Sequence, residues 1–333
     1  MSSILLIAFG AFAASYLLQW SIIKLSYRYN IFIDSHMDDK PQNFHDNATP
    51  RAGGIGIMVS MLFLLLTPIG WKLLFSFLLA FLSGIFEDLH RSLQPKVRLI
   101  LQFVAASSAV ILTSSVITYF GFDFTVSYDI GILLSILGIM GMMNAINMID
   151  GFNGLASGMV LLMLIAFGTI AYRVGDSDIV YISIITISSL LAFLIFNFPQ
   201  GKIFLGDGGS YLLGFIVAVM GIFLASNYMK VSPWFVLAVL IYPSWEVIFS
   251  IIRKLLLRRS PLEPDSLHLH MLIYKHFTKS NHLTSLVIVS ATSPFMLMPI
   301  LYANNSTANF LTSLLYIILY TALYRYLYLR YEK

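Results

Sequence analysis

The chain contains no cysteine and few charged residues. None of its 333 residues is Cys, and Asp, Glu, Lys and Arg together make up only 11% of them. The lack of cysteine excludes disulfides, thiolate metal ligands and cysteine nucleophiles. The scarcity of charge, together with 58% hydrophobic residues and a mean hydropathy of +0.83, excludes an ordinary soluble domain. The composition therefore indicates an all-α, polytopic integral membrane protein.

Apolar runs recur along the whole chain, and each has about the length of 20 residues that a membrane-spanning helix needs. The first run starts at Ile4 without a basic segment before it, so we expect it to remain in the protein as a helix and not to be removed as a signal peptide. We predict a single transmembrane domain over 1–333 with about eleven spans, at 3–23, 53–70, 71–86, 98–120, 128–146, 156–173, 179–197, 208–227, 232–252, 283–302 and 308–328.

The basic residues predict how these spans are oriented. If the segment after the first span is cytoplasmic, 17 of the 20 Lys and Arg residues fall on the cytoplasmic side, and only Lys72, Arg173 and Lys230 on the other. The positive-inside rule then places the N-terminus outside and the C-terminus in the cytoplasm. The net charge of +4 is explained by orientation and by anionic lipid of the bilayer, without nucleic acid. The cytoplasmic loops are expected at about 24–52, 87–97, 147–155, 198–207 and 253–282.

Two of these loops carry carboxylates at the end of an apolar run. Glu87 and Asp88 are adjacent, and Asp207 stands among glycines directly before a span. Carboxylates at a membrane boundary are costly unless they meet a cation, and Mg²⁺ prefers one or two carboxylates together with substrate phosphates. The alternatives are an acid pair balanced by Arg91 and Lys96, and an N-cap role for Asp207.

Polar residues repeat at intervals of three between two other spans. Asn144, Asn147, Asp150 and Asn153 follow one another at this spacing, and in a helix they would gather along one side. Amides and a carboxylate in this register suit hydrogen bonding to a nucleobase, a ribose or a sugar. We predict a substrate-binding segment here.

The first inward loop mixes basic side chains with a turn. It includes His45 and Arg51, and ends in Gly53 and Gly54 before an apolar run. Glycine amides at a helix start can approach an anion. A solvated loop that begins a helix is the alternative reading.

The last inward loop contains His268 and His270, at positions i and i+2. The absence of a thiol and of a Glu-x-x-His partner argues against a zinc site. Binding of a diphosphate fits the surrounding basic residues better. A solvated basic loop is the alternative. Glu246 lies well inside a predicted span, where an ionisable group is a functional candidate or a structural partner for a nearby basic or hydroxyl group.

Taken in their order along the chain, these motifs resemble those of the polyprenyl-phosphate N-acetylhexosamine-1-phosphate transferases. These are the WecA-like enzymes of glycosyltransferase family 4 and, more distantly, MraY. The resemblance covers nearly the whole chain on consecutive inward loops. The motifs that carry it are Thr49-Pro50-Arg51-Ala52-Gly53-Gly54, Glu87-Asp88, Asn144 to Leu155, Phe204 to Ser210 and His268-x-His270.

The resemblance implies transfer of an N-acetylated amino sugar 1-phosphate from a UDP-sugar to undecaprenyl phosphate, in the bacterial inner membrane, with the site facing the cytoplasm. It implies Mg²⁺, with Mn²⁺ as a substitute, and a homodimer. Implied metal ligands are Asp207 and Asp88, and Glu87 joins them as a catalytic residue. The implied substrate contacts are Asn144, Asn147, Asp150, Asn153, Phe204, Lys96, His45, Arg51, His268 and His270. Among them, Phe204 would be a uracil-stacking ring.

Three positions depart from the family pattern. Glu87 replaces the usual first Asp of the acid pair, Asn153 replaces a second Asp, and Met271 stands where many members have a third His. Because Asn153 cannot ionise, a metal or base role at that position is in doubt. These changes favour a subfamily with altered sugar specificity.

A secondary transporter is the rival class, since it would also be polytopic with scattered charges. Transporters usually bind substrate near the midplane on broken helices, whereas most acids here lie at inward span ends. Within the family, a phospho-MurNAc-pentapeptide transferase is the alternative, and the Thr-Pro-Arg and His-x-His forms argue against it.

Overall fold

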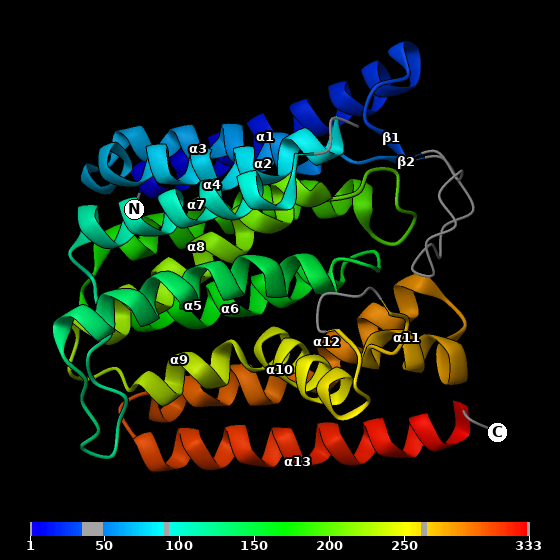
Figure 1. Cartoon of the computed structure of the whole chain (residues 1–333). Coiled ribbons are helices and arrows are strands. Elements are labelled where there is room, and N and C mark those ends of the chain that lie inside the picture. The colour runs from blue at the N-terminus through cyan, green and yellow to red at the C-terminus, as the bar shows by residue number, and fades with distance from the viewer. Residues whose placement is uncertain (1, 35–48, 90–92, 261–264, 332–333) are drawn as a thin grey trace.

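The computed structural model describes residues 2–34, 49–89, 93–260 and 265–331, and these residues are almost entirely helical (Figure 1). The predicted all-α membrane protein is confirmed. The elements in chain order are α1 Ser2–Tyr29, β1 Ile33–Asp34, β2 Thr49–Pro50, α2 Gly53–Ser60, η1 Met61–Leu66, α3 Pro68–Asp88, α4 Pro95–Thr113, α5 Tyr128–Ile149, α6 Leu155–Val174, α7 Ser177–Asn197, α8 Gly206–Asn227, α9 Pro233–Val239, α10 Ile241–Leu256, α11 Leu269–Ile273, η2 Tyr274–Thr278, α12 Asn281–Leu297, η3 Met298–Tyr302 and α13 Ser306–Tyr331.

Each predicted span coincides with a helical segment, but one of them is short. In the described part of the chain, nine helices are long and apolar enough to cross a membrane, and α9 with α10 makes a tenth if the bent pair is one span. The predicted span at 53–70 needs correction: the helix ends at Leu66, because Thr67 is extended and α3 starts at Pro68. Gly53–Leu66 is therefore too short to be counted with the others.

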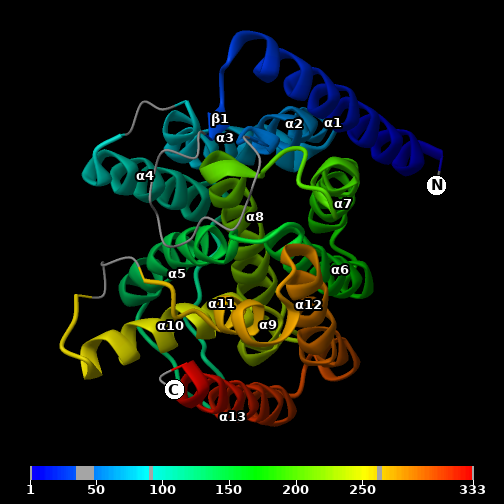
Figure 2. The same cartoon turned by 90° about the vertical axis from the view of Figure 1, so that its right-hand side faces the viewer.

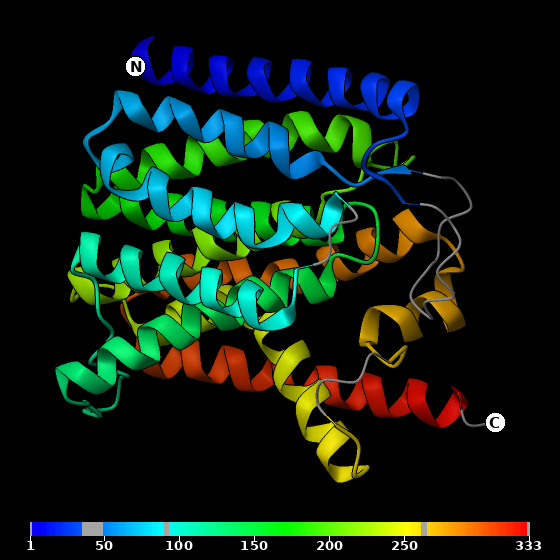
Figure 3. The ribbon, with the colours of Figure 1, turned by 45° about the horizontal axis from the view of Figure 1, so that its top comes forward.

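Two further predicted spans are interrupted. The run at 98–120 is helical only to Thr113, because Ser114 adopts a left-handed conformation with φ 53°. The run at 232–252 bends by 80° between α9 and α10, and α10 projects away from the bundle (Figure 3). Pro243 explains this break, since it lacks an N–H and its ring would clash with the carbonyl of Val239 in a continuous helix.

Helix α8 forms the centre of the bundle. It packs against α3, α5, α2 and α6 and is surrounded by other helices in the end-on view (Figure 2). Because α8 is apolar on all sides after its first turn, burial on every face is the stable arrangement. A Cβ on Gly84 of α3 would lie 2.3 Å from the backbone of Asp207. Glycine at this position therefore lets α3 approach the first turn of α8.

The chain termini lie at opposite ends of the bundle (Figure 1). The segments around β2, before α8, after α5 and around α11 all lie at the end that carries the C-terminus (Figures 1 and 3). These segments belong to the loops predicted to be cytoplasmic. The fold thus brings sequence-distant polar loops together, while the orientation across the membrane stays a prediction.

Candidate functional site

A group of polar side chains, here called the carboxylate cluster, surrounds the N-terminus of α8. Its members are Arg51, Asp88, Asn147, Asp150 and Asp207. They come from the segment before α2, the end of α3, the end of α5 and the start of α8. All five were predicted as site residues, and the fold brings them together across up to 156 positions of sequence.

Asp88 caps α8 from another helix. Its Oδ1 accepts a hydrogen bond from the backbone N–H of Asp207 (2.9 Å), and its Oδ2 accepts one from Gly208 (2.9 Å). A carboxylate at a helix N-terminus satisfies free N–H groups and interacts favourably with the helix dipole. Gly206 makes this contact feasible, because it has φ +78° and a Cβ there would lie 2.6 Å from Asp88. Both Asp88 oxygens are thus committed to positioning α8.

Asp207 does not cap its own helix. Its Oδ1 accepts hydrogen bonds from Arg51 Nη2 (3.1 Å) and from Asn147 Nδ2 (3.1 Å). Within the described residues, its Oδ2 accepts no hydrogen bond from protein, and the side chain is 14% exposed. Asp207 therefore retains a carboxylate oxygen for a ligand, whereas Asp88, with a side chain 1% exposed, does not present one.

Arg51 links the two acids. Its Nε lies 3.8 Å from Asp88 Oδ1, and its Nη2 contacts Asp207. Its backbone position is set by a parallel bridge to Phe204, beside which Phe204 N donates to Pro50 O (2.8 Å). The amides of Gly53 and Gly54 donate to the carbonyls of Phe204 and Leu205. Since these two amides are engaged, the anion contact expected of them is absent in this arrangement.

The two asparagines of α5 face different neighbours. Asn147 Nδ2 contacts Asp207 and also Ser210 Oγ (2.9 Å). Asn144, one turn earlier, donates to Gln102 Oε1 on α4 (2.9 Å) and to the carbonyl of Met140 (2.8 Å). Asn144 therefore joins α5 to α4, and of these two asparagines only Asn147 belongs to the carboxylate cluster.

Asp150 follows the last residue of α5, outside the helix. Burial raises the pKa of its carboxyl well above the ordinary value of 3.8; the positive charge of Arg51 opposes the shift, and the negative charges of Asp207 and Asp88 add to it. The carboxyl of Asp150 is thus within electrostatic range of Asp207 and Asp88. Groups with such a shifted pKa are concentrated at functional sites.

Asn153 lies beyond the helix and connects loops. Its Nδ2 donates to Pro199 O (3.1 Å), and its backbone N–H donates to Asn281 Oδ1 (2.7 Å). Asn197 continues this bracing, because its Oδ1 accepts from Gly154 N (2.7 Å) and its Nδ2 donates to Ile203 O (2.8 Å). Only the first two residues of the predicted three-residue series are therefore helical, because α5 ends at Ile149. Asn153 instead holds the 150–154 and 197–203 segments together.

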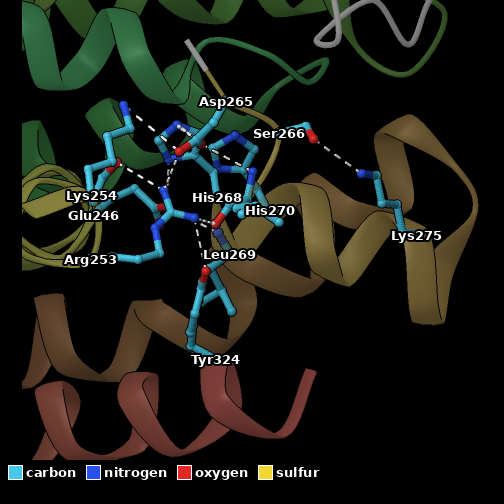
Figure 4. A network of polar contacts seen from close by, with 12 residues as sticks. Glu246, Arg253, Lys254, Asp265, Ser266, His268, Leu269, His270, Lys275 and Tyr324 are labelled. Carbon is cyan, nitrogen blue, oxygen red and sulfur yellow. Dashed lines mark hydrogen bonds and ion pairs between the residues drawn. The ribbon is translucent and has the colours of Figure 1, made fainter. Parts of the chain in front are cut away.

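A second polar group, here called the histidine network, lies around α11 (Figure 4). It comprises Glu246, Arg253, Asp265, His268 and His270. His268 Nδ1 lies 3.1 Å from Glu246 Oε1, and its Nε2 lies 3.6 Å from Asp265 Oδ1. Arg253, in the last turn of α10, donates to Asp265 Oδ2 (2.8 Å). This arginine, predicted to lie in a loop, is therefore helical, buried and paired.

His270 is fully buried and stacks on His268. The two rings are nearly parallel, at 3°, with centroids 5.4 Å apart. Its Nδ1 lies 3.3 Å from the Tyr242 hydroxyl. Burial lowers the pKa of His270 from 6.5 to about 4, an effect that exceeds the opposing influence of Glu246. His270 is therefore neutral at physiological pH.

Phe152 connects the two polar groups. Its ring meets His270 edge to face at 5.6 Å and also contacts Tyr274 at 5.5 Å. Phe152 lies two residues after Asp150 in the same loop. Phe152 thus brings the loop that carries Asp150 into contact with α11 and η2.

Two predicted site residues, Lys96 and Glu87, make none of these contacts in the described ranges. Lys96 is exposed in the first turn of α4, and Glu87 is partly buried beside Asp88. His45 lies outside the described residues. Their predicted roles stay predictions.

The cluster can accept a divalent cation at one carboxylate. Within the described ranges, no group of three or more His, Asp and Glu side chains is arranged to hold a metal ion by itself. Mg²⁺, however, commonly uses one or two protein carboxylates, with water and substrate phosphates as its other ligands. The unpaired Oδ2 of Asp207 fits that coordination, while Asp88 fits a supporting position better.

Several residues of the site were not assigned a role from the sequence. Ser210, one turn after Asp207, accepts from Asn147. Tyr320 and Tyr324 of α13 donate to Glu246 Oε2 (2.8 Å) and accept from Arg253 Nη1 (3.0 Å), respectively. The regular i, i+4 spacing of tyrosines in α13 was the available signal, but aromatic residues at such spacing are usually read as packing.

Comparison with known proteins adds an independent finding. A sequence profile described as glycosyl transferase family 4 matches residues 70–225. This stretch runs from the third residue of α3 to the last turn of α8 and includes four of the five members of the carboxylate cluster. Arg51 is the member that precedes it.

Two similar proteins match over most of this chain. One, from Bacillus subtilis, is named probable undecaprenyl-phosphate N-acetylglucosaminyl 1-phosphate transferase and is 29% identical over 267 residues, covering 75% of this chain and 73% of its own. The other, from Thermotoga maritima, is named undecaprenyl-phosphate alpha-N-acetylglucosaminyl 1-phosphate transferase and is 28% identical over 269 residues, covering 78% and 80%.

A third relative matches over a shorter stretch. A phospho-N-acetylmuramoyl-pentapeptide-transferase from Streptococcus agalactiae is 33% identical over 159 residues. The match covers 46% of this chain and 46% of that protein. This match thus spans about half of the chain.

Proposed function

Because the chain belongs to glycosyl transferase family 4, we propose that it transfers an N-acetylated amino sugar 1-phosphate from a UDP-sugar to undecaprenyl phosphate. The products are UMP and an undecaprenyl-diphosphate sugar. This reaction is the first membrane step of a cell-surface polysaccharide such as O-antigen, other lipopolysaccharide or capsule. The two relatives that match over most of the chain are named as N-acetylglucosaminyl transferases, so GlcNAc is the first sugar to test.

The observation that carries the proposal is the convergence of the carboxylate cluster on the first turn of α8. Arg51, Asp88, Asn147 and Asp207 are joined by direct contacts at one end of a membrane-embedded bundle. An anionic, water-soluble donor and a lipid acceptor would meet at such a boundary. Transport is disfavoured, because Glu246, the acid deepest in a helix, is fully engaged with neighbouring side chains.

The chemistry is a phosphoryl transfer that needs positioning and charge neutralisation more than covalent help. An oxygen of the lipid phosphate attacks the β-phosphorus of the UDP-sugar and forms a new P–O bond. The anhydride bond to the α-phosphate breaks, and its electron pair leaves with UMP. With the lipid phosphate as dianion no proton transfer is required, and an aspartyl-phosphate intermediate is the alternative route.

Each cluster residue has a proposed part in this reaction. Arg51 neutralises phosphate charge while it holds Asp207, and Asn147 orients the Asp207 carboxylate and contacts the nucleotide-sugar. Asp150 accepts hydrogen bonds from the sugar or ribose. Asp88 fixes the first turn of α8, so that Asp207 keeps its place. Bound at Asp207, Mg²⁺ would neutralise developing charge on the phosphates.

We further propose that the cluster faces the cytoplasm of a bacterial inner membrane. The end of the bundle that bears the cluster carries the loops with most of the Lys and Arg residues, in agreement with the positive-inside rule. UDP-sugars are made in the cytoplasm, so this orientation gives the site access to its donor.

The decisive experiment measures UMP release by purified protein supplied with undecaprenyl phosphate, Mg²⁺ and a panel of UDP-amino sugars. UDP-GlcNAc, UDP-GalNAc and 6-deoxy analogues form the panel, with mass spectrometry of the lipid product. We expect release with at least one sugar and its loss when EDTA removes the metal. Absence of release across the panel would overturn the proposal.

A further inference from the structure

Glu246 is a buried carboxylate held by three donors. It lies in α10 with an exposed fraction of 1%. Its Oε1 accepts a hydrogen bond from Leu269 N (3.1 Å) and lies 3.1 Å from His268 Nδ1, while its Oε2 accepts from the Tyr320 hydroxyl (2.8 Å). One side chain thus connects α10, α11 and α13.

Such a group is costly if its purpose is only cohesion. Taking a carboxylate out of water carries a large desolvation penalty, and a well-packed apolar side chain often stabilises a fold as well or better. In α10, which is part of a bent membrane segment, the penalty is greater still. We therefore ask which neighbouring groups the Glu246 carboxylate orients.

The geometry fixes His268. Because the Glu246 carboxylate faces Nδ1, this nitrogen carries hydrogen, and the imidazole ring is held in one orientation with Nε2 directed toward Asp265. The Leu269 N–H on the same carboxylate oxygen fixes the first turn of α11. Ring and backbone are thus oriented by one acid.

The effect extends to the carboxylate cluster through two ring contacts. His268 stacks on His270, and His270 meets Phe152 edge to face. Phe152 belongs to the loop of Asp150. A continuous series of contacts therefore runs from Glu246 to the Asp150 loop.

From these contacts we propose that Glu246 is a positioning residue, which sets the place of His268, His270 and α11 relative to the Asp150 loop for phosphoryl transfer. This inference rests on the proposed function. Glu246 itself contacts no substrate; it acts through His268 and Leu269, much as outer residues orient the ligands of a metal site.

A double-mutant cycle tests the proposal. Glu246→Gln, His268→Gln and the double variant are compared for kcat and KM of UMP release, and Tyr316→Phe is the control, because it removes a hydroxyl from the same face of α13 one turn before Tyr320. We expect Glu246→Gln to lower kcat/KM about tenfold, the range found for residues that orient active groups. In the His268→Gln background, the same change should cost less than about twofold. Tyr316→Phe should retain wild-type rates.

Hydrogen–deuterium exchange supplies a readout that is independent of activity. In Glu246→Ala, the Leu269 amide loses its acceptor, so exchange in the 268–273 segment should rise while exchange in α8 stays unchanged. Independent, multiplicative effects of Glu246→Gln and His268→Gln, or unchanged exchange in α11, would overturn the inference. If wild-type protein releases no UMP while wild type and Glu246→Ala still differ in exchange, the proposed reaction is overturned, and only the placement of α11 by Glu246 is supported.

Discussion

The carboxylate cluster and the histidine network lie at the same end of the bundle and are joined by Phe152, yet their polar atoms are satisfied differently. In the histidine network, both Glu246 oxygens and four donor contacts of Arg253 are occupied by protein. In the carboxylate cluster, Asp207 keeps one oxygen without a protein donor in the described part of the chain, and Arg51 is one-third exposed. In the described residues, His270 Nε2 and Arg253 Nε of the histidine network also have no hydrogen-bond partner. The difference therefore concerns the acids: Asp207 keeps an oxygen for a ligand, and Glu246 does not.

The contrast also applies to two acids of one cluster. Asp88 and Asp207 lie side by side, but Asp88 gives both oxygens to backbone N–H groups, while Asp207 faces side chains. A carboxylate that is bound to backbone on both oxygens stabilises structure. One with a free oxygen is available for chemistry.

Replacing Asp207 should have the largest effect. Asp207→Asn keeps the shape of the side chain but removes the charge that Arg51 and a metal ion require, so UMP release should fall at least about 100-fold. The assay is UMP release at saturating Mg²⁺. Asp129→Asn is the matched control. Asp129 is an exposed acid in the first turn of α5, at the end of α5 opposite to Asn147, so this variant should keep wild-type activity. Activity in Asp207→Asn near that of the control would refute the assignment.

Asp88→Asn should affect stability and activity together. An amide offers one acceptor oxygen where two N–H groups now donate to a carboxylate, which should cost about 1–3 kcal/mol and lower activity about tenfold by displacing Asp207. Thermal unfolding in detergent and kcat provide the measurements. Asp176→Ala is the comparison, since it removes the carboxylate that caps α7 at the opposite end by accepting from Ile179 N. A loss of activity equal to that of Asp88→Asn would show that a damaged cap alone explains the defect.

Asp150→Asn should stabilise the protein and impair binding. Because the folded-state pKa of Asp150 lies above its ordinary value of 3.8, its ionisation costs stability once the pH exceeds that value. The variant should therefore melt at a higher temperature than wild type at pH 7, with a gain that shrinks as the pH falls toward 4. At the same time KM for the UDP-sugar should rise several-fold. A lower melting temperature at pH 7 would contradict this account.

At neutral pH the smallest effect is expected for protonation of His270, because this effect develops only as the pH falls below about 6.5. The folded-state pKa of about 4 lies below the ordinary 6.5, so the unfolded chain takes up a proton first as the pH falls. Stability should drop between these values by at most about 1.4 kcal/mol per pH unit, and level off below them. His270→Gln should show a shallower dependence of melting temperature on pH. Equal slopes in both proteins would place His270 in a less buried setting.

Much of the site could be predicted from residue type and spacing. Arg51, Asp88, Asn147, Asp150 and Asp207 interrupt long apolar runs, and the cost of polar groups near a membrane makes each of them conspicuous. Their convergence followed from placing alternate loops on one side. The proposed roles of these residues remain predictions.

Other expectations failed for physical reasons. The three-residue spacing of Asn144, Asn147, Asp150 and Asn153 suggested one helical face. However, α5 ends at Ile149, and Asn144 turns toward Gln102. The span expected at 53–70 stops at Leu66, because Thr67 and Pro68 start a new helix. Helix ends are decided by local caps and prolines. A span predicted from the mean hydropathy of about 20 residues does not detect them.

The amino-acid sequence by itself determined that this protein is an all-α membrane protein and which polar residues stand at its span ends, because hydropathy and charge act residue by residue. Only the tertiary structure decided how those residues divide their roles. Asp88 caps a helix that begins 118 positions later in the chain, and Glu246 orients His268 from a different helix. Such contacts depend on the packing of separate helices, and a linear pattern carries no record of which helices will touch.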